Sequence, residues 1–267
     1  MQIPGMAVLA CPTCNTATST RPTRAGDVAL CGNCGLTFCD TDDTIVATPH
    51  DFFDADLPAQ EAAARRMVEG RMRAYEHILG RPVESVIEVG CGTGAWARAW
   101  QEKGCTWTGV EFLPERAEQT RERTGAFVVT GDFITVADLP RADVLFCSQV
   151  LEHVAAPIPF LRRAREVADL IHIDVPNQRS ITATARRLLG SKDYGFIQLP
   201  HHLRAYTSPS LAYAMTAAGF QVRDCRSIAN DDATFGQLFA GRSIRQRLAY
   251  RTANAIGRGS LLMAIGA

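Results

Sequence analysis

The sequence predicts an α/β protein with a mostly parallel, doubly wound sheet and a small N-terminal module. Short apolar runs alternate with helical patterns over residues 58–267, as expected when parallel strands are buried between helices. One run, Val86 to Val89, ends in glycines at every second position before a helical pattern begins at Ala95. Two C-x-x-C pairs precede this region. A chain of 267 residues, 46% of them hydrophobic, suits one α/β domain with such an appendage.

Residues 1–40 are expected to form a zinc-binding module that resembles a zinc ribbon. The two C-x-x-C pairs are separated by residues 15–30, a spacing typical of a closed four-cysteine zinc site. That intervening segment is polar, so we expect the metal rather than a core to supply the folding energy. Two disulfides or a chance spacing are the alternatives, and Cys39 is expected to be a bystander thiol. The expected metal ligands are Cys11, Cys14, Cys31 and Cys34.

Residues 41–57 are acidic and irregular and are interpreted as a linker, in which Phe52 and Phe53 could dock on a neighbouring domain. A helical pattern rich in Ala, Glu, Arg and Met follows over residues 58–80 and stops at Gly80-Arg81-Pro82. The α/β domain is therefore expected to span residues 58–267.

The turn after the strand at residues 86–89 is the first candidate binding site. Its glycines allow positive φ angles and let a ligand approach the main chain. The next strand, residues 105–110, ends in Glu111, which should face the crevice at the carboxyl ends of the strands. A carboxylate there can accept hydrogen bonds from both hydroxyls of a ribose. The alternatives are a glycine turn without a ligand and an exposed Glu at a strand end.

The remaining chain continues the alternation. Inserts at residues 178–199 and 230–258 are expected to cover a substrate cleft, the second with a basic amphipathic helix at 243–257. His172 lies within an apolar strand and is interpreted as a core residue. Strands are expected at 126–130, 142–148, 170–177 and 260–267, and a further strand is expected to open at residues 219–222. Helices are expected at 114–125, 159–169, 183–190 and 208–219.

Two motifs carry a family resemblance. Residues 88–94 read E-V-G-C-G-T-G, which resembles motif I of the class I S-adenosylmethionine (AdoMet) methyltransferases. Residues 150–154 read V-L-E-H-V, similar to motif IV of the small-molecule members of that class. The resemblance implies a Rossmann-like seven-stranded sheet whose last two strands form a reversed, hairpin-like end. It also implies an AdoMet-dependent methyltransferase.

The same resemblance implies the cofactor contacts. Glu111 would bind the ribose, Asp132 would lie at the adenine amino group, and Phe133 would lie near the adenine ring. For Asp132 the alternative is a turn residue. The expected AdoMet-binding residues are Glu88, Gly90, Gly92, Gly94, Glu111, Phe112, Asp132, Phe133 and Gln149.

A narrower resemblance concerns the acceptor. The cysteine pairs together with P-H-H-L at residues 200–203 look like bacterial methyltransferases of sugar and natural-product biosynthesis. The zinc-bearing sugar C-methyltransferases of that group have H-E-H-L in this place and a long C-terminal domain. Both differences favour O-methylation of a related small molecule over C-methylation.

Three histidines are candidates for the chemistry. Methyl transfer to a hydroxyl or an acidic carbon requires loss of a proton, and imidazole suits that role near neutral pH. His202 is the first candidate for the general base and His153 the second, while His201 is expected to hydrogen-bond the substrate. For each, the alternative is a capping or packing role.

The charge balance bears on the partners. Lys+Arg and Asp+Glu both number 28, so no global basic field favours nucleic acid or anionic membranes. No apolar run is long enough for a membrane span, no signal peptide is evident, and we expect a cytoplasmic protein. An RNA or protein methyltransferase that grips a polymer with its zinc module is the second hypothesis, and a non-catalytic zinc-ribbon interaction protein is the third. Arginines for a local basic patch are Arg186, Arg187, Arg242, Arg245, Arg247 and Arg251.

Overall fold

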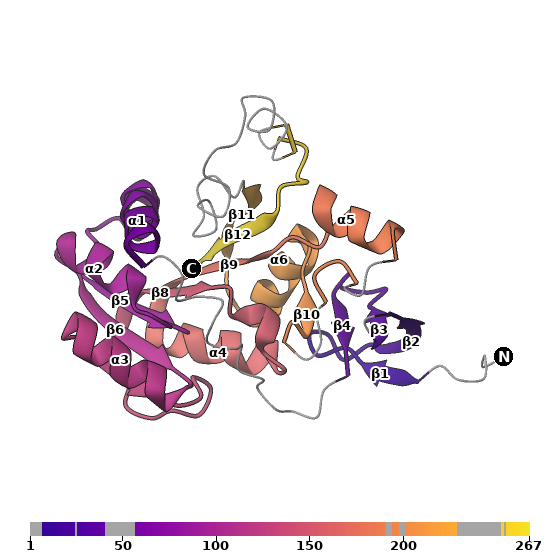
Figure 1. Ribbon diagram of the computed structural model, residues 1–267, viewed down its shortest axis with the longest axis horizontal. Helices are drawn as coiled ribbons and strands as arrows, with labels where there is room; N and C mark the ends of the chain where they lie inside the picture. Colours follow the sequence, from indigo (N-terminus) through magenta and orange to yellow (C-terminus); the bar gives the residue numbers. More distant parts are fainter. Residues whose placement is uncertain are drawn as a thin grey trace.

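The computed structural model describes residues 7–24, 26–40, 57–190, 194–197, 201–228, 252–253 and 255–267. Two sheets organise these residues, a large one in the middle of the molecule and a small one beside it (Figure 1). The expected linker at 41–57, apart from Leu57, and most of the expected insert at 230–258 lie outside the described residues. No helix in the described ranges has both the length and the apolar composition to cross a bilayer.

The large sheet has seven strands in the order β11-β12-β9-β8-β5-β6-β7. Neighbouring strands from β9 to β7 are parallel, whereas β12 runs antiparallel to both β9 and β11. This confirms the predicted Rossmann-like fold and its reversed end. The strands are β5 (Ser85–Val89), β6 (Thr106–Glu111), β7 (Phe127–Thr130), β8 (Ala142–Ser148), β9 (Ala168–Pro176), β11 (Val222–Ile228) and β12 (Leu261–Gly266).

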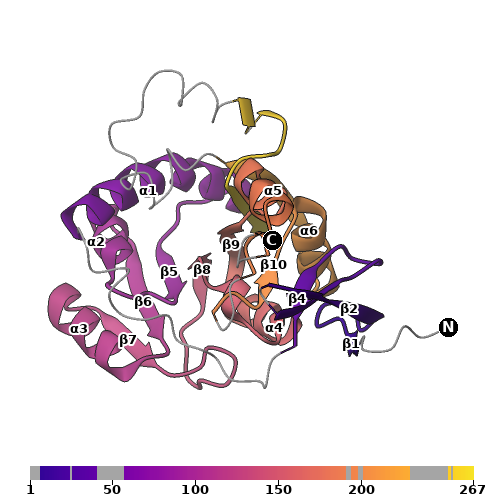
Figure 2. The ribbon, with the colours of Figure 1, turned by 45° about the vertical axis from the view of Figure 1, so that its right-hand side comes forward.

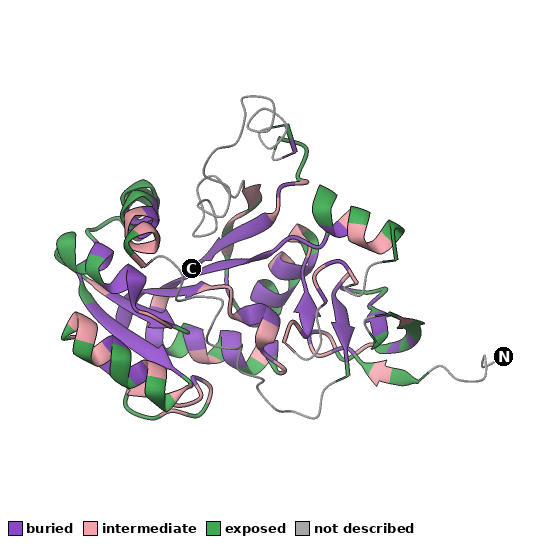
Figure 3. Ribbon diagram, in the orientation of Figure 1, coloured by how far each residue is buried: buried purple, intermediate pink, exposed green. Residues whose placement is uncertain are grey.

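Helices cover both faces of this sheet because its strands alternate apolar side chains between the two faces. Val86 contributes to a core with α1, α2 and α3, whereas Ile87 contributes to a core with α4 and α6. Figure 2 shows the ribbon of the sheet and its helices from a second side. The central strands β5, β8, β9 and β12 are mostly buried, whereas the helices expose their outer faces (Figure 3). The helices are α1 (Leu57–Leu79), α2 (Ala95–Glu102), α3 (Pro114–Thr124), α4 (Pro157–Val167), α5 (Ile181–Leu188) and α6 (Ser208–Ala217).

The small sheet combines the N-terminal residues with a strand from much later in the chain. Its order is β1-β2-β3-β4-β10, and all of its pairs are antiparallel. The strands are β1 (Val8–Ala10), β2 (Ala17–Thr23), β3 (Gly26–Leu30), β4 (Thr37–Cys39) and β10 (Arg204–Ala205). The N-terminal module is therefore completed by backbone hydrogen bonds from the region that follows β9.

The expectation that residues 15–30 build no core is wrong at the end of this segment. Val28 and Ala29, both in β3, are fully buried. Val28 packs with Ile197 and Leu203, and Ala29 belongs to the core on the α4 and α6 face of the large sheet. The module thus gains burial against the rest of the chain, which its own polar composition could not provide.

Arg204 connects the small sheet to the large one through hydrogen bonds from its buried side chain. Its side chain is only 4% exposed, and its guanidinium donates to the carbonyl oxygens of Cys39 at 2.8 Å, Leu203 at 3.0 Å and Ala155 at 2.9 Å. Cys39 belongs to β4, whereas Ala155 follows β8. The expected bystander Cys39 is buried beside this contact, with its thiol facing the Leu203 carbonyl at 3.4 Å.

We expect Arg204→Met to lower the free energy of unfolding by about 2–3 kcal/mol, because the carbonyls of Cys39 and Ala155 lose a charged donor in a buried setting. Urea denaturation measures the loss. The matched control is Arg226→Met, since the Arg226 side chain is 66% exposed and pairs with Asp224 at the surface. That control should change stability by less than about 0.5 kcal/mol. Equal losses in both variants would show that Arg204 does not fasten the sheets.

Candidate active site

The glycine turn after β5 lies where the order of the sheet reverses. From β5 the chain proceeds to β6 and β7 on one side and to β8 and β9 on the other. In open α/β sheets, ligands bind in the crevice at such a switch point, outside the carboxyl ends of the strands. The sequence-predicted residues at the ends of β5, β6 and β8 are therefore brought to one edge of the sheet.

Each glycine of the turn has a positive φ angle, of 70° at Gly90, 50° at Gly92 and 65° at Gly94. A Cβ on Gly90 would lie 2.5 Å from Cγ2 of Val150, the residue two positions after β8. A Cβ on Gly94 would lie 2.7 Å from Cγ2 of Thr120 in α3. Gly92 is different, because the nearest atom to its added Cβ would be 3.9 Å away. Only the middle glycine thus faces open space, where a ligand could approach the main chain.

Glu111 holds the middle of the turn. One of its carboxylate oxygens accepts a hydrogen bond from the Gly92 amide at 2.9 Å, and the other accepts from the Leu113 amide at 3.0 Å. The Thr120 hydroxyl donates to the Gly92 carbonyl at 2.5 Å. Each carboxylate oxygen has a further lone pair, so Glu111 could still accept hydrogen bonds from two ligand hydroxyls.

Glu88 lies below the turn rather than at its surface. It is 3% exposed and accepts a hydrogen bond from the indole N–H of Trp107 at 2.9 Å. Burial raises the pKa of Glu88 to about 8, although the Trp107 hydrogen bond works against this shift. The acidic residue of the motif therefore supports the turn from the α1, α2 and α3 face of the sheet.

The other predicted cofactor residues lie in differing surroundings. Asp132 accepts a hydrogen bond from the Ile134 amide at 2.9 Å, whereas Phe133 is buried against Phe160 of α4 with ring centroids 4.9 Å apart. Phe112 is 42% exposed next to Glu111. Gln149 has a positive φ of 57°, and its backbone N–H donates a hydrogen bond to the Asp174 carbonyl at 2.8 Å. Their roles toward a cofactor stay predictions.

A network of buried polar side chains connects α1 to β9 near the carboxyl ends of the strands. The sequence alone did not reveal this network. Arg71 pairs with Asp174 at 2.9 Å, and Asp174 also meets Nε2 of His172 at 3.1 Å. The other nitrogen of His172 lies 2.7 Å from the Tyr75 hydroxyl. Burial lowers the pKa of His172 to about 4. His172 is thus a core residue, as interpreted from its apolar neighbours. The available signal was the charged Asp174 within a buried strand.

The histidine candidates separate into a pair and a neighbour. His153 lies in the short 3-10 helix η2 (Leu151–His153) after β8, and His202 lies just before β10. Their ring centroids are 4.7 Å apart, with the ring planes at 82°. His201 contributes its backbone carbonyl, which lies 2.9 Å from Nδ1 of His153. Burial lowers the pKa of His153 to about 3, so this ring is neutral at physiological pH.

Glu152 joins this pair and was overlooked among the sequence candidates. One ligand atom each from Glu152, His153 and His202 lies within 4.8 Å of the others. Glu152 is 1% exposed, and burial raises its pKa to about 8. The signal was present in the sequence, because Glu152 precedes His153 directly in the V-L-E-H-V segment.

The four cysteines of the C-x-x-C pairs also converge. Their thiol sulfurs all lie within 4.8 Å of one another, with Cys11 and Cys34 at 3.5 Å and Cys14 and Cys31 at 3.4 Å. A tetrahedral ion with sulfur ligands at about 2.3 Å requires sulfur separations of about 3.8 Å. The two closest pairs are slightly shorter than this value, and the cluster is compatible with a four-thiolate zinc ion.

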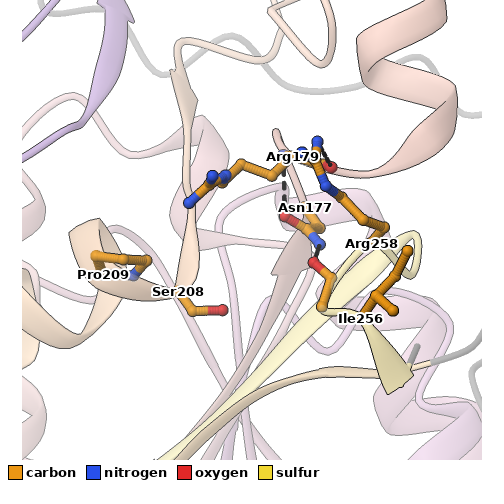
Figure 4. Close-up of a pocket in the computed structure, with 7 residues that line it drawn as sticks. Asn177, Arg179, Ser208, Pro209, Ile256 and Arg258 are labelled. Atoms are coloured by element: carbon orange, nitrogen blue, oxygen red, sulfur yellow. Dashed lines mark hydrogen bonds between the residues drawn. The ribbon is translucent and has the colours of Figure 1, made fainter. Parts of the chain in front are cut away.

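Two cavities lie away from the glycine turn. One of about 300 Å³ lies at the carboxyl end of β9, where Asn177, Arg179, Ser208 and Arg258 surround it (Figure 4). Asn177 orders this region by donating to the Gly259 carbonyl at 2.8 Å. The other cavity, of about 250 Å³, lies between β2 and α5. Its lining includes Arg21, Arg24, Arg186 and Arg187.

Known proteins resemble the chain over this same region. A family model described as "Methyltransferase domain" matches residues 59–224. A ubiquinone biosynthesis O-methyltransferase of Xanthomonas campestris pv. campestris (strain B100) is 26% identical over 224 residues, which cover 79% of this chain and 88% of that protein.

Two solved structures share the fold at low sequence identity. One is the plantazolicin methyltransferase BamL in complex with a triazolic desmethylPZN analog and SAH. Its TM-score is 0.54 at 12% identity, and the alignment covers 81% of this chain and 87% of the BamL chain. The magnesium protoporphyrin IX methyltransferase of Synechocystis PCC 6803, with bound SAH, has a TM-score of 0.51 at 12% identity and covers 83% and 89%.

Proposed function

Because the chain belongs to the methyltransferase-domain family, we propose that it transfers the methyl group of AdoMet to an oxygen of a small-molecule acceptor. The acceptor classes that we favour are sugars and intermediates of secondary metabolism. The geometry of the glycine turn and of Glu111 carries this proposal. Gly92 presents open main chain, and Glu111 beside it has two acceptor oxygens held in place by backbone amides.

The cofactor would lie across the glycine turn with its ribose on Glu111. One observation in support is that the turn and Glu111 are already hydrogen-bonded to each other. Cofactor binding would therefore cost little conformational entropy at these residues. The second is that Val150 packs against Gly90, which sets the segment after β8 directly beside the turn. The adenine contacts of Asp132 and Phe133, and the contacts of Phe112 and Gln149, remain part of this proposal.

The acceptor would lose its proton at η2, which begins one residue after Val150. Glu152 and His153 belong to η2, and the side chain of His202 lies next to them. Methyl transfer forms a bond between the acceptor oxygen and the methyl carbon and breaks the bond from that carbon to sulfur, whose positive charge is then neutralised by the bonding electron pair. His202 is the first candidate to assist proton loss and His153 the second, while His201 is a candidate for hydrogen-bonding the acceptor.

We also propose that Cys11, Cys14, Cys31 and Cys34 hold a structural zinc ion. The sulfur separations support this, and a closed four-cysteine site leaves no position for substrate. The ion would fix the loops that precede β2 and β4. Because β4 pairs with β10, and β10 begins two residues after His202, the zinc module would help to position the histidine pair.

The alternative is an RNA or protein methyltransferase that uses the zinc module for polymer recognition. The cavity between β2 and α5 favours it, since four arginines line that cavity, from the module and from α5. Binding through such arginines releases counterions, so retention of single-stranded RNA would fall steeply with salt concentration. Weak retention at all salt concentrations would favour the small-molecule acceptor.

We expect Glu111→Ala to weaken AdoMet binding by roughly 1.5–3 kcal/mol, because the ribose hydroxyls lose a charged acceptor. Isothermal titration calorimetry with the folded variant measures this. Glu115→Ala is the matched control, since Glu115 is an exposed carboxylate in the first turn of α3. AdoMet affinity equal to wild type in Glu111→Ala would refute the ribose assignment.

We expect His202→Ala to lower kcat by about 10²–10⁴ while AdoMet affinity stays intact, because the group that assists proton loss is absent. His153→Ala should cost less. The control is His77→Ala, an exposed histidine of α1. A fall after His153→Ala alone would reverse the two roles. If neither variant loses activity, the acceptor does not need a protein base, and O-methylation at this site is refuted.

We expect Cys14→Ser to remove one tightly bound zinc ion per chain, measured by elemental analysis after dialysis under reducing conditions. Its kcat should fall more than its AdoMet affinity, because β10 and His202 depend on the module whereas the glycine turn does not. The control is Cys225→Ser, a half-buried cysteine of β11 outside the cluster. Zinc retained after Cys14→Ser would reject the four-cysteine site.

A further inference from the structure

We propose that Glu152, His153 and His202 form a second metal site, which holds a divalent transition-metal ion at the acceptor side of the crevice. Their ligand atoms lie within 4.8 Å of one another, close enough for small side-chain rotations to bring all three to one ion. The role of this site in methyl transfer rests on the proposed function, whereas metal binding itself does not.

The hydrogen bonds of the two rings prepare them as ligands. Nδ1 of His153 lies 2.9 Å from the His201 carbonyl, and Nδ1 of His202 lies 3.1 Å from the Phe196 carbonyl. A carbonyl oxygen can only accept, so Nδ1 carries the proton in each ring and Nε2 has the lone pair. This is the arrangement of metal-binding histidines, whose second nitrogen donates to a backbone carbonyl or carboxylate and so fixes the tautomer and the ring orientation.

Glu152 supplies an independent indication. It is 1% exposed, and neither of its carboxylate oxygens has a hydrogen-bond partner among the described residues. The nearby buried guanidinium of Arg204 is directed at the backbone carbonyls of Cys39, Leu203 and Ala155 instead. An unpaired buried carboxylate is costly, and coordination of a cation is one of the ways in which proteins offset that cost.

The donor set indicates the kind of ion. Two imidazole nitrogens and one carboxylate oxygen suit Zn²⁺, Fe²⁺, Co²⁺ or Ni²⁺ better than Mg²⁺, which prefers oxygen ligands and keeps its waters. Three protein ligands leave at least one position open, in contrast to the closed four-cysteine cluster. The two sites on this chain therefore differ in both ligand chemistry and accessibility.

An open position here would accept the acceptor's oxygen. Val150, which packs on Gly90 of the turn, lies two residues before Glu152, so the ion would lie beside the bound cofactor. A hydroxyl on a divalent ion loses its proton to solvent water more readily, as metal-bound water does. Its oxygen then forms the bond to the methyl carbon while the carbon–sulfur bond breaks and its electron pair stays on sulfur. Nε2 of each ring would bind the ion rather than take the proton. The favoured acceptors are hydroxyl compounds, and those with two adjacent oxygens could fill two open positions.

The test is a Co²⁺ titration of the full chain whose four-cysteine site is already filled with zinc. Wild type should bind one equivalent of Co²⁺ with visible d–d absorption and without the thiolate-to-cobalt charge-transfer band. Glu152→Gln and His202→Ala should each weaken this binding by at least about 100-fold, because they remove a ligand rather than an outer partner. His77→Ala and His201→Ala should bind Co²⁺ as wild type does. Circular dichroism on the same samples verifies that each variant is folded, and AdoMet calorimetry measures cofactor binding separately.

Absence of Co²⁺ binding by wild type, or unchanged binding in both Glu152→Gln and His202→Ala, overturns the metal site. The outcomes separate the two proposals. If the protein binds AdoMet and transfers the methyl group without a metal ion at this site, the proposed function stands, and a role of the ion in methyl transfer is refuted. Co²⁺ bound by these ligands in a chain that does not bind AdoMet keeps the metal site and refutes the proposed function.

Discussion

The pairing of β4 with β10 is the contact on which the arrangement of this molecule depends. It crosses from the N-terminal module to residues 204–205, and the buried guanidinium of Arg204 adds bonds to the carbonyls of Cys39 and Ala155. Since Leu203 also donates its amide to the Glu152 carbonyl at 2.9 Å, the same stretch of backbone touches η2. The cysteine cluster, the strand β10 and the histidine pair are therefore connected through backbone hydrogen bonds, so a displacement of one is expected to displace the others.

The glycine turn is built differently, because the contacts that hold it among the described residues come from the large sheet, α3 and the segment after β8, and none of these comes from the N-terminal module. Gly90 meets Val150, which follows β8, Gly92 meets Glu111 from β6, and Gly94 meets Thr120 from α3. The cofactor crevice and the acceptor side are thus supported by separate sets of contacts that meet at Val150. This separation is the physical reason why changes at the module should affect turnover more than cofactor binding.

Much of the fold followed from local patterns. Strand ends fall within a few residues of those expected, and the reversed end formed by β11 and β12 is confirmed, because buried parallel strands must be apolar and glycine turns must permit positive φ angles. The core of the N-terminal module did not follow in the same way. Val28 and Ala29 are buried by Ile197, Leu203 and the large sheet, partners that lie far away in the sequence.

The sequence by itself determined the doubly wound sheet, the glycine turn with Glu111 at the next strand end, and the four-cysteine cluster, since each depends on residue spacing over short distances. Only the tertiary structure decided which polar residues meet. It joined Glu152 to His153 and His202 while leaving the His201 ring outside that group, and it paired Arg71 with Asp174. Such partners are chosen by the crossing of elements distant in the chain, and a buried carboxylate left without a donor becomes visible only when all its neighbours are in place.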